Sequence, residues 1–362
     1  MAADRVTSKD VAYRAGVSRT TVSLVLNNVH GAQISQATRQ RVLQAAHDLN
    51  YVPDAAAKAL ASRQSQIIGL ILIRTPQQIA SDAFLTQTLN GLIESAHRQG
   101  LRLLIDIVEP QHQKETYLQL VRAKHIDGIL LSGPRFDDEA LNALQESAFP
   151  TVLLGQIPGS WFTFVDVDNR AAAHEAVAHL LNLGHTRIAC ITNAPLTYTA
   201  AVERLNGYRG AIENAGLQFD PSLVRSGDFD AESGYRQMQD LLDSGVSFTA
   251  AFIASDTLAF GAKAALREHG MRVPGDIALV GFDDIPFSRF TDPPLTTVHL
   301  PAVELAHQAA EMLFKILRGE EPEQKQVILE THLVVRDSCG AKLSGGAKLP
   351  VLTPVQTNPS PA

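Results

Sequence analysis

The stretch Thr7–Asn28, TSKDVAYRAGVSRTTVSLVLNN, constrains the fold of this chain more than any other feature. Thr7 is a helix-capping residue type, and Asp10 stands three residues later, where its carboxylate completes a capping box. Gly16 ends this first helix, because glycine takes the left-handed backbone of a tight turn without a steric cost. Ser18 is placed to cap a second helix. The spacing therefore predicts two short helices joined by a turn.

The second predicted helix has two distinct sides. Val22, Val25 and Leu26 recur at helical spacing and form its apolar side. The opposite side carries mostly short polar groups, which suit a helix that lies in the major groove of DNA. A plain helical hairpin that only buries its apolar residues is the alternative interpretation. The residues expected to contact DNA are Ser18, Arg19, Thr20, Thr21, Ser23, Leu24 and Asn27.

Charge is distributed unevenly along the chain. Residues 1–63 hold eight lysines and arginines against four acidic residues, a balance of +4. The remaining residues hold 23 basic and 34 acidic side chains, a balance of −11, which accounts for the formal net charge of −7. A basic head on an acidic body is suited to attract phosphate groups. The charge pattern therefore favours the DNA-binding interpretation over the plain hairpin.

The overall composition indicates a globular protein of several domains. With 362 residues the chain is longer than one hydrophobic core usually serves, so two or three domains are expected. Cys190 and Cys339 are the only cysteines, which specifies neither a disulfide framework nor a zinc finger. The chain has no run of about 18 apolar residues, and its N-terminus is polar as far as Lys9. We therefore expect a cytoplasmic protein without a membrane span or secretory signal.

Residues 1–50 are expected to form the complete head domain. Ser35 is placed to cap a third helix over Gln36–Leu49. The residues predicted on its inner side are Val42, Leu43, Ala46 and Leu49.

Residues 51–65 form a linker in which Pro53 separates the head from an alanine-rich run, Asp54–Ala61. The run has helix propensity but is too short to be helical alone in water. It is either a segment that folds when paired or bound, or a plain tether. Leu60 is the only large apolar side chain of the run, and its isolation favours the first interpretation.

Residues 66–340 show a different pattern, in which strands and helices alternate in two successive series. The fully apolar run Ile67–Ile73 is typical of a strand buried on both faces of a parallel sheet. Two such series predict an α/β core of two similar lobes, and facing strand tips form a natural ligand cleft. Residues 341–362 are rich in Pro, Gly, Ser and Thr and are expected to be a disordered tail.

Charged residues at element ends are the candidates for ligand binding. Asp256 and Asp283 each follow a predicted strand, and Arg204 lies near the start of a predicted helix. Carboxylates and a guanidinium that face one cleft suit a hydroxyl-rich small molecule. The alternatives are structural, because an aspartate at such a junction is often a helix cap and an arginine near a helix start is usually a surface residue.

Three segments, DVAYRAGVSRTTVSLVLN, LNYVPDAAAKAL and IGLI, closely resemble the lactose-repressor (LacI/GalR) family of bacterial transcription regulators. The resemblance extends to about Asp337. It implies a homodimer on a pseudopalindromic operator, with paired hinge helices in the minor groove and Leu60 wedged into the central base step. The family's base-reading positions fall on Arg19, Thr20 and Leu24. Leu24 either touches a thymine methyl group or only shields its neighbours.

The same resemblance implies a periplasmic-binding-protein-like core with an effector site. ERLNGY places Arg204 in that site, and GDFDAESGY places Phe229 there as an aromatic wall. Gly155 departs from the aspartate that some sugar-binding members carry, so the resemblance indicates a sugar or related metabolite without naming one. The residues that it assigns to the effector site are Phe84, Arg204, Phe229, Ser255, Asp256 and Asp283.

Signatures of other protein classes are missing from the sequence. It contains no GxSxG, GxxxxGK[ST] or HExxH motif, and its twelve histidines lack metal-ligand spacing. We therefore expect no enzyme, cofactor or metal. The rival interpretation is a solute-binding protein of a transport system, since its two-lobed cleft would be nearly the same. The basic head and the absence of a predicted signal peptide argue against it.

Overall fold

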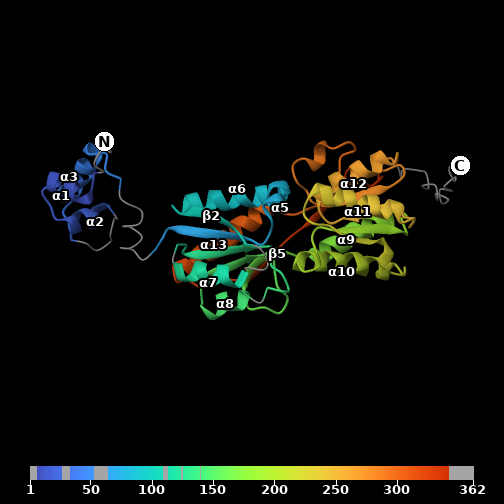
Figure 1. The fold of residues 1–362 in the computed structure, drawn as a ribbon, viewed down its shortest axis with the longest axis horizontal. Helices are drawn as coiled ribbons and strands as arrows, with labels where there is room; N and C mark the ends of the chain where they lie inside the picture. The colour runs from blue at the N-terminus through green and yellow to red at the C-terminus, as the bar shows by residue number, and fades with distance from the viewer. Residues whose placement is uncertain are drawn as a thin grey trace. The chain divides into compact units, whose positions relative to one another are not determined.

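The computed structural model describes residues 6–26, 33–52, 64–108, 113–123, 125–138 and 140–341. These residues form two compact units, which divide between Gln66 and Ile67. The first unit contains the helices α1 (Ser8–Ala15), α2 (Arg19–Leu26) and α3 (Gln36–Asp48), and the second contains two α/β lobes (Figure 1).

The helix-turn-helix of the first unit forms as its local sequence predicts. The backbone N–H of Thr7 donates to the carboxylate of Asp10 at 2.8 Å, and Gly16 has a φ of 66° between the two helices. The hydroxyl of Ser18 accepts a hydrogen bond from the backbone N–H of Thr21 at 3.1 Å, which caps α2. The buried core that joins the three helices consists of Val11, Ala12, Ala15, Val22, Val25, Val42, Ala45 and Ala46.

One prediction about α3 is wrong. Leu43 is 48% exposed, whereas its neighbour Val42 is fully buried. The buried side of α3 is formed by Val42, Ala45 and Ala46, which recur at helical spacing. Leu43 comes one residue after Val42, so its side chain points away from that side of the helix.

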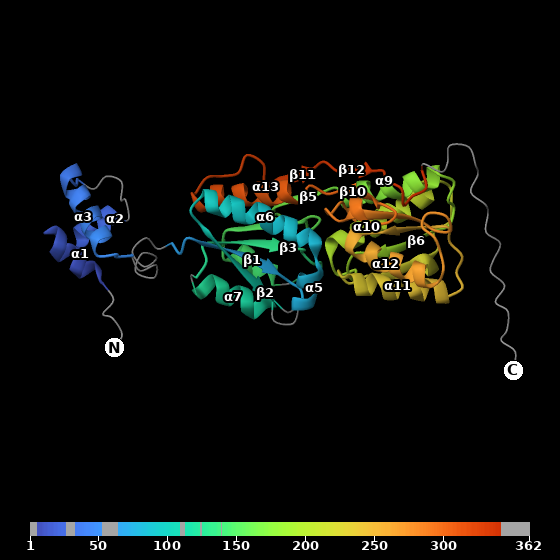
Figure 2. The same ribbon diagram turned by 90° about the horizontal axis from the view of Figure 1, so that it is seen from above.

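The first lobe is built on a parallel sheet covered by helices on both faces. On one face lie α6 (Ala83–Arg98) and α13 (Ala302–Leu317), and on the other α7 (Gln113–Ala123) and α8 (Leu141–Glu146) (Figures 1 and 2). The late helix α13 thus packs back onto the first lobe. The strand order is β11 (Gln326–Leu329), β5 (Thr163–Val167), β4 (Thr151–Leu154), β3 (Gly128–Ser132), β1 (Ile67–Leu72) and β2 (Arg102–Ile107).

The apolar sequence of β1 is explained by its place inside this sheet. Ile68, Leu70 and Leu72 pack in the cluster that includes α6 and α13. Ile71 and Ile73 pack in the cluster on the opposite face. Because successive side chains of a strand point to opposite faces, a strand covered on both sides needs an uninterrupted apolar run.

The second lobe repeats this plan with one difference. Helices α9 (Asn169–Asn182) and α10 (Thr199–Asn214) cover one face of its sheet, and α11 (Ala231–Asp243) and α12 (Asp256–Glu268) cover the other. β12 runs antiparallel to β10, whereas the other neighbouring strands described in this sheet are parallel. The strand order is β12 (His332–Val334), β10 (Thr296–His299), β9 (Ala278–Asp283), β8 (Ala250–Ile253), β6 (Ile188–Thr192) and β7 (Val224–Ser226).

A short helix at the end of the first lobe was not predicted from the sequence. α5 (Pro76–Ser81) follows β1 and lies at the end of the first lobe that faces the second lobe (Figures 1 and 2). The hydroxyl of Thr75 accepts from the backbone N–H of Gln78, and the Gln78 side chain accepts from the Thr75 backbone, so a capping box begins the helix.

Among the helices of the described ranges, none is both long and apolar enough to cross a membrane.

Candidate functional site

The first candidate surface is the outer side of α2. Ser18, Arg19, Thr20 and Ser23 are exposed, while Thr21 and Leu24 are partly buried. Side chains predicted to contact DNA therefore reach solvent, and the apolar side of the same helix is fixed in the core of the head. Two further residues of the predicted DNA contact, Asn27 and Leu60, lie outside the residues that the structure describes, as does most of the predicted hinge.

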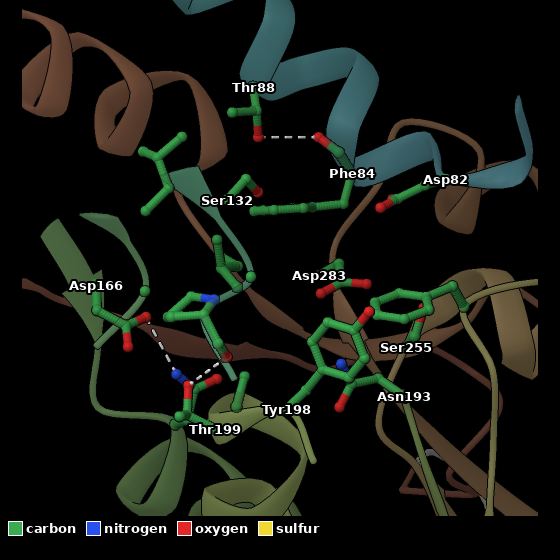
Figure 3. Close-up of a pocket in the computed structure, with 18 of the residues that line it drawn as sticks. Asp82, Phe84, Thr88, Ser132, Asp166, Asn193, Tyr198, Thr199, Ser255 and Asp283 are labelled. Carbon is green, nitrogen blue, oxygen red and sulfur yellow. Dashed lines mark hydrogen bonds between the residues drawn. The ribbon is translucent and has the colours of Figure 1, made fainter. Parts of the chain in front are cut away.

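The second candidate site is a cleft between the two lobes, where the carboxyl ends of their parallel strands face each other. Figure 3 shows Asp82 and Phe84 entering it from the α5–α6 segment, with Asn193 and Tyr198 on the opposite side. The polar and aromatic residues that line it are Arg74, Asp82, Phe84, Thr88, Ser132, Asp166, Asn169, Asn193, Tyr198, Thr199, Arg204, Phe229, Ser255 and Asp283.

Arg204 is held rigidly at the base of this cleft. Its Nε donates to Oδ1 of Asn169 at 2.8 Å, and its Nη1 donates to the backbone carbonyl of Ala254 at 2.6 Å. The same Nη1 lies 3.5 Å from Oδ1 of Asp283, and the guanidinium stacks 3.7 Å from the ring centre of Phe282. Burial lowers the pKa of Arg204, and the neighbouring Asp283 opposes that change. The predicted arginine therefore lies in the cleft with its orientation already fixed.

Two cleft carboxyl groups have altered acidity. Burial raises the pKa of Asp283 to about 7, although the positive charge of Arg204 opposes the shift. Burial also raises the pKa of Asp166 to about 6, against a backbone hydrogen bond from Val167. Carboxyl groups with such values gain from a ligand that donates hydrogen bonds to them, because the donors favour the ionised form.

Backbone strain coincides with the cleft. Phe229 has a φ of 65° and Asp283 a φ of 114°, both in the region that residues with a Cβ rarely adopt. Such residues persist where the surrounding structure holds them, and they cluster at binding sites. Phe229 packs edge-to-face against Tyr198 with ring centres 4.9 Å apart. The aromatic wall predicted at Phe229 is thus part of the cleft lining, together with a tyrosine that was not predicted.

The position of Asp256 does not support its predicted contact with an effector. This residue is fully buried and is not part of the cleft lining. Its carboxylate accepts hydrogen bonds from the backbone N–H of Ile285 at 3.0 Å and from the hydroxyls of Ser288 and Thr297, each at 2.6 Å. Asp256 therefore ties α12 to β10 and to the loop that follows β9. Its neighbour Ser255 does line the cleft, as predicted.

The first lobe contributes charged residues that the sequence reasoning missed. Arg74 lies two residues after the end of β1 and forms an ion pair with Asp82. Asp82 also caps α6 by accepting a hydrogen bond from the backbone N–H of Leu85. The Arg74 guanidinium also lies 4.2 Å from the ring centre of Phe229, which belongs to the second lobe. The sequence does contain a signal for Arg74, because it is the first charged residue after the apolar run Ile67–Ile73 and therefore lies near a strand end.

The structure gives a steric reason for glycine at position 155. Its φ is 112°, and a Cβ built on it would lie 2.7 Å from Cδ of Pro134. An aspartate therefore does not fit at this position of the cleft.

Several contacts already join the lobes across the cleft. Gln78 Nε2 of α5 donates to Oδ1 of Asp228 at 2.6 Å, and the backbone N–H of Phe136 donates to the carbonyl of Thr197 at 2.9 Å. The arrangement can enclose a small polar molecule and couple its binding to the angle between the lobes. The described ranges contain no group of three or more His, Cys, Asp or Glu side chains that could hold a metal ion.

A helix-turn-helix head on a two-lobed ligand-binding core defines the class of this protein, and comparison with known proteins identifies its family. Residues 7–54 match the bacterial regulatory proteins of the lacI family, and residues 177–339 match the periplasmic binding protein-like domain. The chain is 35% identical over 337 residues to the HTH-type transcriptional regulator CelR of Thermobifida fusca, which covers 92% of this chain and 98% of CelR.

Solved structures agree with these sequence matches. A Lac repressor dimer bound to operator and the anti-inducer ONPF aligns with a TM-score of 0.81 and 30% identity, covering 93% of this chain and 99% of the repressor chain. A CelR–cellobiose complex aligns with a TM-score of 0.71 and 34% identity, covering 92% of this chain and 100% of the CelR chain. The chain therefore belongs to the lacI family of bacterial regulatory proteins, and it is a DNA-binding transcription regulator of that family.

Proposed function

We propose that this protein is a repressor that binds a pseudopalindromic operator as a homodimer, and that an effector in the interlobe cleft controls its affinity for that operator. The observation that supports this proposal most strongly is that one chain combines two features: an exposed recognition helix and a cleft whose charged groups come from both lobes. The proposed DNA contacts are Ser18, Arg19, Thr20, Thr21, Ser23, Leu24, Asn27 and Leu60, and the proposed effector contacts are Phe84, Arg204, Phe229, Ser255 and Asp283.

Dimerisation is supported by the edge of the first-lobe sheet. On β2, which is the last strand of that sheet, Leu104 is 41% exposed, Ile105 45% and Ile107 40%. An exposed apolar edge strand is a hazard for a monomer and a natural contact for a second copy. The Lac repressor is a dimer on its operator, and two heads must reach major-groove faces about 34 Å apart.

The effector acts through the angle between the lobes. In this mechanism a ligand that binds one lobe arrangement better than another shifts the population of dimers whose heads fit both half-sites. The coupling expected for such a system is about 1 to 3 kcal/mol, or about 5- to 150-fold in operator affinity. The solute-binding alternative lacks support, because it gives no role to the exposed polar residues of α2.

The experiment is selection and sequencing of genomic DNA fragments retained by the purified full-length protein, followed by titration of the recovered site. We expect a palindromic site whose binding weakens steeply with salt, because phosphate contacts release counterions. Retention of no preferred sequence, in the presence or absence of a metabolite extract, would contradict the proposal.

Two variants then test operator binding and effector binding separately. Leu60→Ala is expected to weaken operator binding while effector binding stays intact, because the wedge in the minor groove is lost. Arg204→Ala is expected to retain operator binding and lose the response to effector, because it removes the guanidinium at the base of the cleft. An unchanged effector dose-response for Arg204→Ala would show that the cleft is not the effector site.

A further inference from the structure

Two histidines tie together two of the segments that cross between the lobes. The chain passes from one lobe to the other between β5 and α9, between β10 and α13, and between β11 and β12. His299 is the last residue of β10 and His332 is the first residue of β12, and the two stand opposite each other in the antiparallel pairing of these strands. Their ring centres lie 4.9 Å apart. The pair therefore lies at the junction of the lobes, where β10 and β12 run side by side (Figure 2).

The two rings share a single counter-charge. Nδ1 of His299 lies 3.0 Å from Oδ2 of Asp284, which follows β9. Oδ1 of the same carboxylate accepts a hydrogen bond from Nη2 of Arg336 at 2.6 Å, so Asp284 already has a cationic partner. Within the described part of the chain, His332 forms no ion pair, and its ring contact is with His299. Positive charge on both rings is therefore not offset by the residues around them.

The other charged groups near the pair are engaged elsewhere. Asp283 of β9 stands beside His299 in the parallel pairing, but its carboxyl group faces Arg204 in the cleft at 3.5 Å. Asp256 of α12 accepts a hydrogen bond from Thr297 of β10, and its three hydrogen bonds hold it in the core of the lobe. Helix α9, which covers the other face of the sheet, buries only uncharged residues. No further carboxylate among the described residues is thus available to balance charge on the pair.

Acid adds repulsion between the two rings. An imidazole side chain changes its charge between pH 5 and pH 8. Two unit charges about 5 Å apart repel each other, and even at the dielectric constant of water this repulsion changes an equilibrium constant by about fourfold. β12 is an edge strand of three residues that pairs with β10 alone, so the contact between the rings contributes to holding it there. Charging both rings therefore weakens the pairing of β10 with β12.

The histidine pair is connected to the cleft through the backbone. Leu300 follows His299 directly and lines the cleft, and its N–H donates to the carbonyl of Asp283 at 3.4 Å. Asp284, the partner of His299, is the next residue after Asp283. A displacement of His299 therefore acts both on the lining of the cleft and on the crossover that leads to α13.

We propose that His299 and His332 form a proton-sensitive element of the hinge between the lobes. Acid charges both rings and weakens the pairing of β10 with β12. The lobes then shift away from the arrangement in which the N–H of Phe136 in the first lobe donates to the carbonyl of Thr197 in the second. Operator affinity follows pH through the angle between the lobes, and this last step rests on the proposed function.

Hydrogen exchange of the full-length protein, measured by mass spectrometry at pH 7.5 and pH 5.5, tests this element. The amide of Phe136 donates across the cleft and reports on lobe separation, whereas the amide of Val108 donates to Leu72 within the first lobe and is the control. His332→Gln keeps a polar side chain at an exposed position and removes its charge. At pH 5.5 we expect Phe136 to exchange at least about threefold faster in wild type than in His332→Gln, with nearly equal rates at pH 7.5. Because the proteins are compared at one pH, the carboxyl groups of the cleft contribute equally to both.

Two further variants assign the response to this pair. His332→Glu places a carboxylate opposite His299, so acid is expected to strengthen the pairing and to make exchange at Phe136 slower than in His332→Gln. His269→Gln is the matched control, because His269 of the same lobe lies 3.7 Å from a carboxylate oxygen of Asp243 and outside the crossovers. Equal rates for wild type and His332→Gln at pH 5.5 overturn the proposal, as does loss of the pH response in His269→Gln.

Operator affinity is measured on the same samples at both pH values. We expect the ratio of the two affinities in wild type to differ from that in His332→Gln by about threefold or more. Operator binding with the same ratio in both proteins contradicts the inference and leaves the proposed function intact. A protein that binds no operator contradicts the proposed function, and the exchange rates then still decide whether the hinge senses protons.

Discussion

The two lobes share one architecture, but they present different kinds of polar group to the cleft. In the second lobe, Arg204 of the cleft lining has three polar partners, and Asp256, which lies outside the lining, accepts three hydrogen bonds, so protein contacts hold both groups in place. In the first lobe, Arg74 is paired only with Asp82 and keeps a buried unpartnered Nε. Arg204 of the second lobe is thus fixed by protein contacts, whereas Arg74 of the first lobe keeps one N–H group without a protein partner.

Helix packing is also tighter in the second lobe than in the first. α11 and α12 approach so closely that a Cβ on Gly261 would lie 1.8 Å from the backbone oxygen of Ala231. α6 and α13 of the first lobe are less tightly packed, because a Cβ on Gly91 would lie 2.7 Å from the backbone oxygen of Val303. The lobe in which protein contacts hold Arg204 and Asp256 is also the lobe with the closer helix contact.

Asp256→Ala is expected to give the largest loss of stability. The substitution leaves the backbone N–H of Ile285 and the hydroxyls of Ser288 and Thr297 without an acceptor, which costs about 3 kcal/mol or more. Asp240→Ala is the control, because Asp240 is an exposed partner of Arg225 and such pairs contribute about 1 kcal/mol or less. Thermal melting of the two variants makes the comparison, and equal losses would show that the buried network is not a special support of the second lobe.

Gly261→Ala is expected to give the next largest loss of stability. Its comparison with Gly91→Ala tests whether the helices of the second lobe pack more tightly than those of the first. Its Cβ meets backbone atoms that cannot move alone, so we expect destabilisation of about 2 to 3 kcal/mol, and a smaller loss for Gly91→Ala. In Gly210→Ala the added Cβ has ordinary contact with His174, and the change is expected to be neutral or to stabilise by up to about 1 kcal/mol. Denaturant midpoints order the three variants, and a Gly91→Ala loss as large as that of Gly261→Ala would remove the packing difference.

The pH dependence of stability is the smallest expected effect. In the second lobe the folded-state pKa of Asp283 is raised from 3.8 to about 7 and that of Asp256 to about 8. A raised carboxyl pKa means that the folded state binds protons more tightly, so its stabilising contribution is full below pH 4 and is lost as the pH rises through the folded value. Between pH 6.5 and pH 8 we therefore expect the free energy of unfolding to fall by about 1 kcal/mol or more.

Two variants assign that pH dependence to a lobe. Asp283→Asn is expected to make the slope shallower without abolishing it, because its side chain no longer titrates while Asp256, with a pKa of about 8, still does. Asp166→Asn in the first lobe is expected to leave the slope nearly unchanged, because the pKa of Asp166 is about 6 and lies below this range. The measurement is the melting temperature of each variant between pH 6.5 and pH 8. If Asp166→Asn reduced the pH dependence and Asp283→Asn did not, the pH dependence would belong to the first lobe.

Local sequence determined the elements of both units and part of the cleft. The capping box at Thr7 and Asp10, the turn at Gly16 and the apolar run of β1 depend on neighbouring residues, so their signals are readable in order along the chain. The family motif in turn placed Arg204 in the effector site, and the structure finds this residue in the cleft lining. Short elements such as α5 were missed because six residues give too little periodicity to detect.

The tertiary structure alone decided which polar groups meet. Asp256 follows a predicted strand as Asp283 does, and its partners are 29 to 41 residues away in the sequence, so the chain pattern could not show that its carboxylate is buried outside the cleft lining. Gln78 and Asp228 are 150 residues apart, and they meet because two separate sheets face each other. Hydrogen bonding and burial act over a few ångströms in space, so the division between cleft and core became visible only when the lobes were folded and facing each other.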